Sequence, residues 1–512
     1  MAGQDRTDRW LLPAYLFLIV YLVINTGVVS DDLEAMMRVK AGSFAGSLVP
    51  KGNFYFISTP LQYYTQYIWY RFFDIYNNTG LNILKIFYML ISFVMIARFF
   101  AIFTAKRTAY LISFLFIFFQ SHDSTVYWFM GQYLTFSIAS YLYAFYLAHR
   151  GRLVAAFLFA LAASFMSYGS TPVAISLFML FAFRRRLREG LVLLVPNVLY
   201  IAYYLLISKV TALGVDRISG ASSAAVVFKQ FILQAVTFFD ATLGPSAWLK
   251  IYYSFGHLTP ISVLIGCTFA AIIYISYSGD EKPDPGLTAS LSMLMVASLA
   301  MFAATGYYPQ MAFNLGNRVT IFGSLLLAYL IMTVPSPKAV RMGLVVVMLL
   351  AALGISDHWK LWSARQQQIF KNIANSACVR NHPDDRMLYV SGNQYSKYGP
   401  FSHIEFLSES FVTEPAFRLA TGRGFTTLSL NRNHKYVDGY IVDMRNGTKT
   451  KADGYIDVYD SEKDACTRLV PGDINGYIDG TPVYLRHWAQ MPQAAFFKKA
   501  AIRLMPRLGH VL

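Results

Sequence analysis

The chain has 512 residues, of which 55% are hydrophobic, 16% are aromatic and only 14% are charged. Soluble domains carry roughly 25% charged residues, so this composition excludes an ordinary soluble protein and indicates a polytopic membrane protein. The net charge of +16 does not indicate a nucleic-acid partner, because much of it lies in short clusters between apolar runs, as at residues 184–188, a pattern typical of cytoplasmic loops.

About eleven apolar runs follow one another along the chain, and we expect each of them to form a membrane-spanning helix. They cover residues 10–29, 82–104, 108–120, 133–148, 153–166, 172–183, 190–207, 259–278, 287–305, 319–334 and 342–355. Several are shorter than the roughly 20 residues of a straight span. The first run is too long for a signal peptide and has no small-residue cleavage site, so we expect it to be retained.

Basic residues give these spans an orientation. If Arg6 and Arg9 are cytoplasmic, the later basic clusters also fall on the cytoplasmic side, and the short loops at 121–132 and 167–171, which contain no Lys or Arg, fall outside. This is the distribution that the positive-inside rule describes. Three long segments then face outward: residues 30–80, residues 209–258 and the tail after residue 356.

A change in composition marks a domain boundary near residue 357. Residues 357–512 contain 20 Lys and Arg and 15 Asp and Glu, whereas the longer part before them contains 24 and 13. Residues 359–375 are expected to form a helix, and alternating stretches at 387–391, 440–444 and 455–459 are expected to form strands. We therefore expect a transmembrane module at 1–356 and an extracytoplasmic soluble α/β domain at 357–512.

Two of the three cysteines, Cys378 and Cys466, lie in the expected outer domain, and the third, Cys267, lies in an apolar run. An oxidising compartment would permit a disulfide between Cys378 and Cys466. The sequence does not give their distance, so this pairing is a prediction from the expected compartment.

Two adjacent carboxylates, Asp31 and Asp32, follow the first apolar run directly. Like charges at a low-dielectric boundary are costly for the fold and suit a general base. The alternative is structural, because Asp31 and Glu34 have the spacing of a capping arrangement that starts a helix. An aromatic-rich stretch at 54–73 follows, and we interpret it as membrane anchoring in the headgroup layer.

A first span, an outward Asp pair directly after it, an aromatic interfacial loop, many short spans and a soluble outer domain together resemble the GT-C superfamily of integral membrane glycosyltransferases. The resemblance covers about residues 1–356. It implies that an acidic residue of the first outer loop is essential and that the sugar donor is a polyprenyl-phosphate or polyprenyl-diphosphate lipid. Many members also carry a soluble outer domain.

The chemistry of glycosyl transfer assigns roles to particular residues. Asp31 or Asp32 would take the proton of the acceptor hydroxyl while its neighbour orients the acceptor. The leaving phosphate needs a cation, and Arg318, in a polar outer loop at the start of a span, is the first candidate, with Arg38 and Lys51 as secondary ones. Arg318 has an alternative role, in which its side chain only reaches the outer headgroups.

Sugar binding is expected in the short outer loop that begins at His122. There polar groups and aromatic rings occur together, in His122, Asp123, Tyr127 and Trp128, and a sugar could stack on a ring and hydrogen-bond to its neighbours. His257, at the end of the second long outer loop, is a weaker candidate. A plain solvated loop is the alternative for this segment.

No cofactor is expected to be required. The sequence has no Cys or His pair at metal-ligand spacing, and although Asp31, Asp32 and Asp123 could share a divalent cation, their spacing does not support it. We expect no metal site.

The sequence therefore predicts an inverting glycosyltransferase that moves a sugar from a polyprenyl-phosphate donor to a glycan, glycolipid or lipid-linked acceptor. A bacterial inner membrane, with the N-terminus in the cytoplasm, is the expected location. Two alternatives stay open: a transporter or flippase of lipid-linked sugars, and a lipid-linked oligosaccharide polymerase or ligase. The spans contain few acids and show no repeat, which favours the transferase over a transporter.

Overall fold

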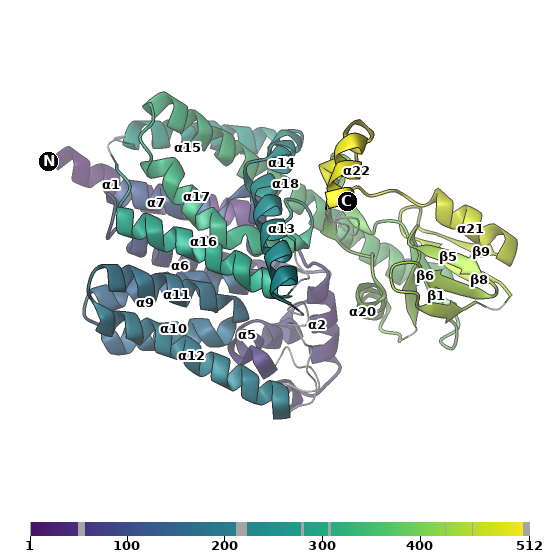
Figure 1. Ribbon diagram of the computed structural model, residues 1–512. Coiled ribbons are helices and arrows are strands. Elements are labelled where there is room, and N and C mark those ends of the chain that lie inside the picture. The colour runs from purple at the N-terminus through teal and green to yellow at the C-terminus, as the bar shows by residue number, and fades with distance from the viewer. Residues whose placement is uncertain are drawn as a thin grey trace. The chain divides into compact units, whose positions relative to one another are not determined.

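The structure is a computed structural model that describes residues 2–49, 57–210, 223–277, 281–305, 309–424, 426–452 and 454–504 (Figure 1). The chain forms two compact units. The helical unit comprises Met1–Thr26, Phe44–Trp69 and Asn82–His358. The mixed unit comprises Gly27–Ser43, Tyr70–Leu81 and Trp359–Leu512.

The described residues of the helical unit form mostly α-helices. Its helices are α1 (Ala2–Val23), α3 (Phe44–Ser47), α5 (Pro60–Thr65), α6 (Thr79–Phe100), α7 (Lys106–Ile117), α8 (Ser124–Tyr127), α9 (Gln132–His149), α10 (Leu153–Met166), α11 (Thr171–Phe183), α12 (Leu187–Val210), α13 (Ala224–Thr242), α14 (Pro245–Phe255), α15 (Pro260–Ser276), α16 (Pro285–Thr305), α17 (Ile321–Thr333) and α18 (Lys338–Asn375). Four 3-10 helices accompany them: η1 (Tyr67–Phe72), η2 (Gln120–His122), η3 (Tyr168–Ser170) and η4 (Leu315–Thr320).

Helix starts in this unit follow from local sequence. Pro245 and Pro260 stand at the first positions of α14 and α15, where the absent N–H of proline is not missed. Before α15, the Thr259 hydroxyl accepts a hydrogen bond from the Ser262 N–H at 3.2 Å. An N-cap of this kind satisfies a free N–H group in the first turn and so fixes where the helix begins.

Six stretches of the described residues are long and apolar enough to cross a membrane: Thr79–Phe100, Leu187–Val210, Ala224–Phe255, Pro285–Thr305, Leu315–Thr333 and Lys338–Asn375. Four shorter apolar helices accompany them: Trp10–Val23, Leu153–Met166, Tyr168–Phe183 and Pro260–Ser276. The chain is thus a mostly helical protein with the composition of an integral membrane protein. The expected number of about eleven spans is not confirmed, because several helices are too short to meet the length of a span.

The mixed unit combines helices and short strands. Its helices are α2 (Asp31–Lys40), α19 (Ala377–Arg380), α20 (Ser410–Thr421), α21 (Pro471–Gly480), α22 (Ala495–Leu504), η5 (Trp488–Gln490) and η6 (Pro492–Ala494). Its strands are β1 (Leu388–Ser391), β2 (Tyr395–Tyr398), β3 (Phe401–Glu405), β4 (Thr427–Ser429), β5 (His434–Val437), β6 (Tyr440–Asp443), β7 (Lys449–Lys451), β8 (Ile456–Asp460) and β9 (Ala465–Leu469). The three strands expected from alternation correspond to β1, β6 and β8.

A four-stranded sheet of order β4-β1-β8-β9 lies at the centre of the mixed unit. β1 pairs in parallel with both β4 and β8, and β9 returns antiparallel to β8. The parallel pair β1 and β4 needs a crossover, and α20 lies between these strands in the chain. Buried side chains including Tyr389, Val458 and Ile474 fill the core. Two smaller antiparallel sheets, β2-β3 and β5-β6-β7, complete the unit.

A disulfide joins Cys378 to Cys466, whose Cα atoms are 6.3 Å apart. It closes a loop with a sequence separation of 88 residues. Cross-links over loops of this length restrict the unfolded chain strongly.

Replacement of Cys378 by Ser should therefore lower the free energy of unfolding of the mixed unit by about 2–4 kcal/mol. The measurement is thermal unfolding of the purified protein in detergent. Cys267→Ser removes an exposed free thiol and serves as the matched control, with no change expected. Equal melting temperatures for Cys378→Ser and Cys267→Ser would contradict the prediction.

Candidate active site

The acidic pair stands at the first turn of α2 in the mixed unit. The chain enters this helix through Gly27, which has φ 71° and a position where any Cβ would collide with Ser363, so glycine is required there. Asp31 and Asp32 stand in the first turn of α2, where the helix dipole favours negative charge. Local sequence therefore explains why two carboxylates can be adjacent here.

Asp32 is fully buried and held from two sides. One carboxylate oxygen accepts a hydrogen bond from the Val29 N–H at 3.0 Å, and the other accepts from the Tyr70 hydroxyl at 2.5 Å. Tyr70 is itself fully buried. From the sequence, Tyr70 was only one aromatic residue of a stretch expected to anchor the chain in the membrane. Its contact with Asp32 could not be predicted, because the two residues are 38 positions apart and share no local pattern.

Asp31 lies in a different environment from its neighbour. Its side chain is partly exposed, and the Ser30 hydroxyl donates a hydrogen bond to it at 3.2 Å. The sequence left open which acid acts as the base. Asp32 is buried and fixed by hydrogen bonds, whereas the Asp31 side chain remains partly accessible.

Glu405, at the end of β3, is electrostatically linked to this pair. Burial raises the pKa of the Glu405 carboxyl to about 7, and the charge of Asp31 also raises it, while a hydrogen bond from the Ser408 hydroxyl acts in the opposite direction. The proton that Glu405 holds near neutral pH therefore reduces repulsion within this acidic region. Glu405 could not be singled out from the sequence, because strand ends often carry acids.

The pKa of Glu405 is higher in the folded protein than in the unfolded chain. Protonation of Glu405 therefore contributes its full stability below the ordinary Glu pKa, and this contribution is lost as the pH rises through about 7. We expect the free energy of unfolding to fall by roughly 1–3 kcal/mol between pH 5 and pH 8. Glu405→Gln should flatten this fall, because the amide stays neutral. Thermal unfolding across this pH range tests it, and an equally steep fall in the variant would contradict it.

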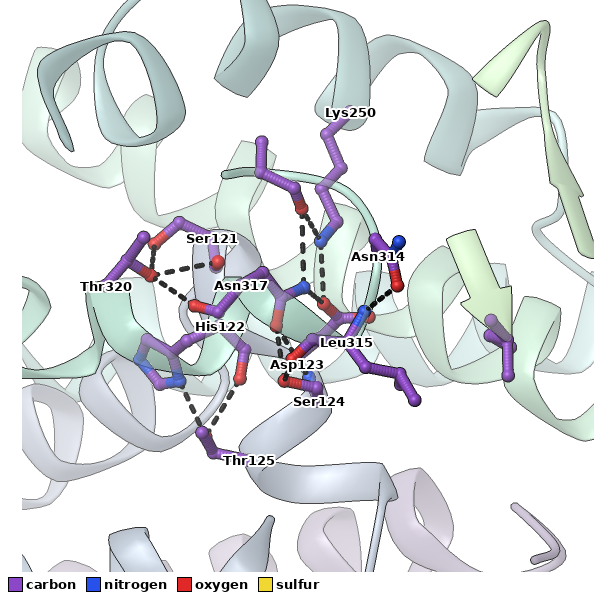
Figure 2. Close-up of polar contacts among 12 residues, drawn as sticks. Ser121, His122, Asp123, Ser124, Thr125, Lys250, Asn314, Leu315, Asn317 and Thr320 are labelled. Carbon is purple, nitrogen blue, oxygen red and sulfur yellow. Dashed lines mark hydrogen bonds and ion pairs between the residues drawn. The ribbon is translucent and has the colours of Figure 1, made fainter. Parts of the chain in front are cut away.

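A second polar cluster lies in the helical unit around Asp123 (Figure 2). The Lys250 ammonium donates to Asp123 Oδ1 at 2.6 Å, and the Asn317 amide donates to the same oxygen at 2.5 Å. Lys250 and Asp123 are both buried. Asn317 also accepts a hydrogen bond from the Ser124 hydroxyl. One carboxylate thus holds together three segments that lie far apart in the sequence.

This geometry favours a structural role for Asp123 over the expected contact with a sugar. Lys250 was not among the residues expected to matter, although a lysine within the apolar stretch of α14 is a visible signal. Its partner could not be identified, because 127 positions separate it from Asp123.

The remaining residues expected to bind sugar are mostly buried. His122 Nδ1 lies 2.9 Å from the Thr125 hydroxyl, and Tyr127 and Trp128 are nearly inaccessible. The His257 ring lies 4.5 Å from the ring of His358, between centroids. The structure therefore places the His122 segment in a packed core rather than in a solvated loop.

Arg318 lies in η4 and lines a cavity of about 260 Å³. Its guanidinium carbon stands 5.0 Å from the centre of the Trp128 ring, a cation–π arrangement. The cavity wall is largely apolar and includes Tyr168, Tyr200 and Tyr204. A cation at the edge of an apolar cavity suits a ligand with an anionic head and an apolar tail.

The two secondary cations have different outcomes. Arg38 forms an ion pair with Glu34 one turn earlier on α2, at 2.5 Å, so its charge is already engaged. Lys51 lies outside the described residues. Among the residues that the structure describes, no group of three or more His, Cys, Asp or Glu side chains could hold a metal ion.

No protein-family model and no curated protein matches this chain. Among solved structures, the chain is similar to the oligosaccharyltransferase of Archaeoglobus fulgidus in its crystal structure with zinc and sulfate, at 12% identity and a TM-score of 0.36. The match covers 90% of this chain and 74% of that chain. A TM-score this low does not establish a shared fold, and the functional conclusion depends on the residues of this chain.

Removal of the Lys250 charge should leave Asp123 buried without its cation. We expect Lys250→Met to lower the free energy of unfolding by about 3–5 kcal/mol. The double variant Lys250→Met with Asp123→Asn should recover part of this loss, because it removes both buried charges. Thermal unfolding in detergent measures both, and a double variant less stable than the single one would contradict the pairing.

Proposed function

We propose that this chain is an inverting glycosyltransferase that moves a sugar from a polyprenyl-phosphate donor to a hydroxyl of a glycan, glycolipid or lipid-linked acceptor on the extracytoplasmic side of a bacterial inner membrane. The observation that carries the proposal is the asymmetry of the acidic pair. Asp32 is fixed by Val29 and Tyr70, while Asp31 beside it is partly exposed.

The reaction requires a base for the acceptor hydroxyl and a positive charge that stabilises the leaving phosphate. Asp31 takes the proton of the acceptor hydroxyl while the acceptor oxygen forms a bond to the anomeric carbon of the donor sugar. The bond from that carbon to the phosphate oxygen breaks in the same step. The anomeric configuration inverts, because a single displacement occurs. Asp32 acts as a positioning residue that fixes the first turn of α2.

Arg318 supplies the charge for the leaving polyprenyl phosphate in this proposal. Its position at an apolar cavity fits a lipid whose phosphate carries the charge and whose chain is hydrocarbon. A monophosphate needs less cationic help than a nucleotide diphosphate, so a guanidinium without a metal ion is a suitable partner.

Separate substitution of the two acids tests the roles. Asp31→Asn should lower turnover by about 10²–10⁴-fold, the usual contribution of a general base, with an unchanged melting temperature. Asp32→Asn should lower both stability and turnover, because a buried amide cannot accept both hydrogen bonds as a carboxylate does. The assay is sugar transfer from a synthetic polyprenyl-phosphate sugar in proteoliposomes.

The control is Glu34→Gln, which removes a carboxylate from the same helical turn and should keep wild-type transfer. Full transfer by Asp31→Asn would contradict the base assignment. Movement of a labelled lipid-linked sugar across the bilayer without any transfer would favour a flippase, and block transfer of whole oligosaccharides would favour a polymerase or ligase.

A further inference from the structure

A cavity of about 500 Å³ in the mixed unit belongs to neither cluster described above. Its lining is strongly basic, with Arg432, Arg445, Arg486 and Lys498 facing one carboxylate, Glu409. The cavity lies within the usual size range of small-molecule sites, roughly 300–1,000 Å³. Four cations around one carboxylate indicate a ligand that carries negative charge.

Part of this charge is already neutralised inside the protein. The Arg445 guanidinium donates to both oxygens of Glu409, at 2.5 and 3.1 Å, and it is also paired with Asp443 at 2.7 Å. Arg445, Glu409 and Asp443 together carry a net charge of −1, so the positive charge of the lining comes from Arg432, Arg486 and Lys498. The cavity keeps its positive character at Arg432 and Arg486.

Arg432 is held in position by a side-chain hydrogen bond, and neither Arg432 nor Arg486 is neutralised by a carboxylate of the described residues. The Arg432 side chain is oriented by its Nε, which donates a hydrogen bond to the Thr481 carbonyl at 2.9 Å. This contact does not use the two terminal nitrogens of the guanidinium. Among the described residues, no carboxylate forms an ion pair with Arg432 or Arg486. A guanidinium held at one edge is prepared to bind a carboxylate or phosphate with two parallel hydrogen bonds.

The rest of the lining suits a saccharide. The rings of Tyr395 and Tyr484 lie 5.3 Å apart between centroids and are tilted by 58°, so they offer both a ring face and a ring edge. The amide of Asn433 adds a donor and an acceptor. Aromatic rings pack against sugar C–H groups and amides hydrogen-bond to sugar hydroxyls, so this lining has the residue types that a saccharide requires.

We propose that this basic cavity binds an anionic saccharide segment, one whose sugars carry carboxylate or phosphate groups. The assignment of that segment to the acceptor glycan rests on the proposed glycosyl transfer, whereas the binding itself does not. Glu405 connects the two regions, because Asp31 and Arg486 both act on its carboxyl. An acceptor held by the cavity is thus bound by the same unit that carries the proposed base.

The test measures binding by the full-length protein in nanodiscs of zwitterionic lipid, with isothermal titration calorimetry. The probes are a galacturonic acid hexamer, the neutral maltohexaose and inorganic phosphate as competitor. We expect the acidic hexamer to bind at least tenfold more tightly than maltohexaose. Arg432→Ala and Arg486→Ala should each weaken it about tenfold.

The matched control is Arg418→Ala, which removes an exposed arginine on α20 that does not line the cavity. It should bind the acidic hexamer as the wild type does. Arg432→Lys keeps the charge and should recover part of the affinity. Unchanged melting temperatures of the alanine variants show that the loss comes from the cavity.

Several results would overturn the proposal. Equal affinity for the acidic and neutral hexamers, or an equal loss in Arg418→Ala and Arg432→Ala, would show that the cavity is not the site. Binding of inorganic phosphate without binding of the acidic hexamer would show that it takes a small anion only.

The two proposals fail separately in this design. Asp31→Asn should lower transfer by about 10²–10⁴-fold and leave binding of the acidic hexamer unchanged. A wild-type protein that binds the hexamer but transfers no sugar contradicts the enzyme assignment alone. A protein that transfers sugar with no preference for acidic saccharides contradicts the cavity assignment alone.

Discussion

The buried carboxylate of Asp32 is the constraint on which the candidate active site depends. A carboxylate inside a protein is tolerated only where hydrogen bonds replace its water. The Val29 N–H and the Tyr70 hydroxyl do this, and each of them fixes a different part of the chain at the start of α2. Because Asp32 is fixed inward, Asp31 is left at the accessible edge of the turn, and the two adjacent acids become chemically different.

The helical unit solves the problem of buried charge in a similar way. Asp123 lies among apolar helices, and the ammonium of Lys250 and the amide of Asn317 share one of its oxygens (Figure 2). Such a pair contributes little net stability, but removal of one partner leaves an uncompensated charge. The Asp123 carboxylate therefore joins α14, η4 and the segment before α8.

Sequence reasoning was effective where the physics is local. Composition identified an apolar helical protein, alternation identified β1, β6 and β8, and the spacing of Asp31 and Glu34 offered, as an alternative, the helix start that α2 has. It was ineffective where partners are distant in the chain. Nothing near Tyr70 shows that it meets Asp32, and nothing near Lys250 shows that it meets Asp123. The expected division at residue 357 followed composition, which cannot show that short segments before it pack with the later domain.

That packing changes what the C-terminal part of the chain can do. The Tyr76 hydroxyl donates to the Ala420 carbonyl at 3.1 Å, and α2 packs against α20. The acidic pair therefore belongs to the same compact unit as the sheet and the basic cavity. Under the proposed function, the saccharide cavity and Asp31 belong to one compact unit. Acceptor recognition and proton removal within one unit would reduce the entropy lost when the hydroxyl is aligned for attack.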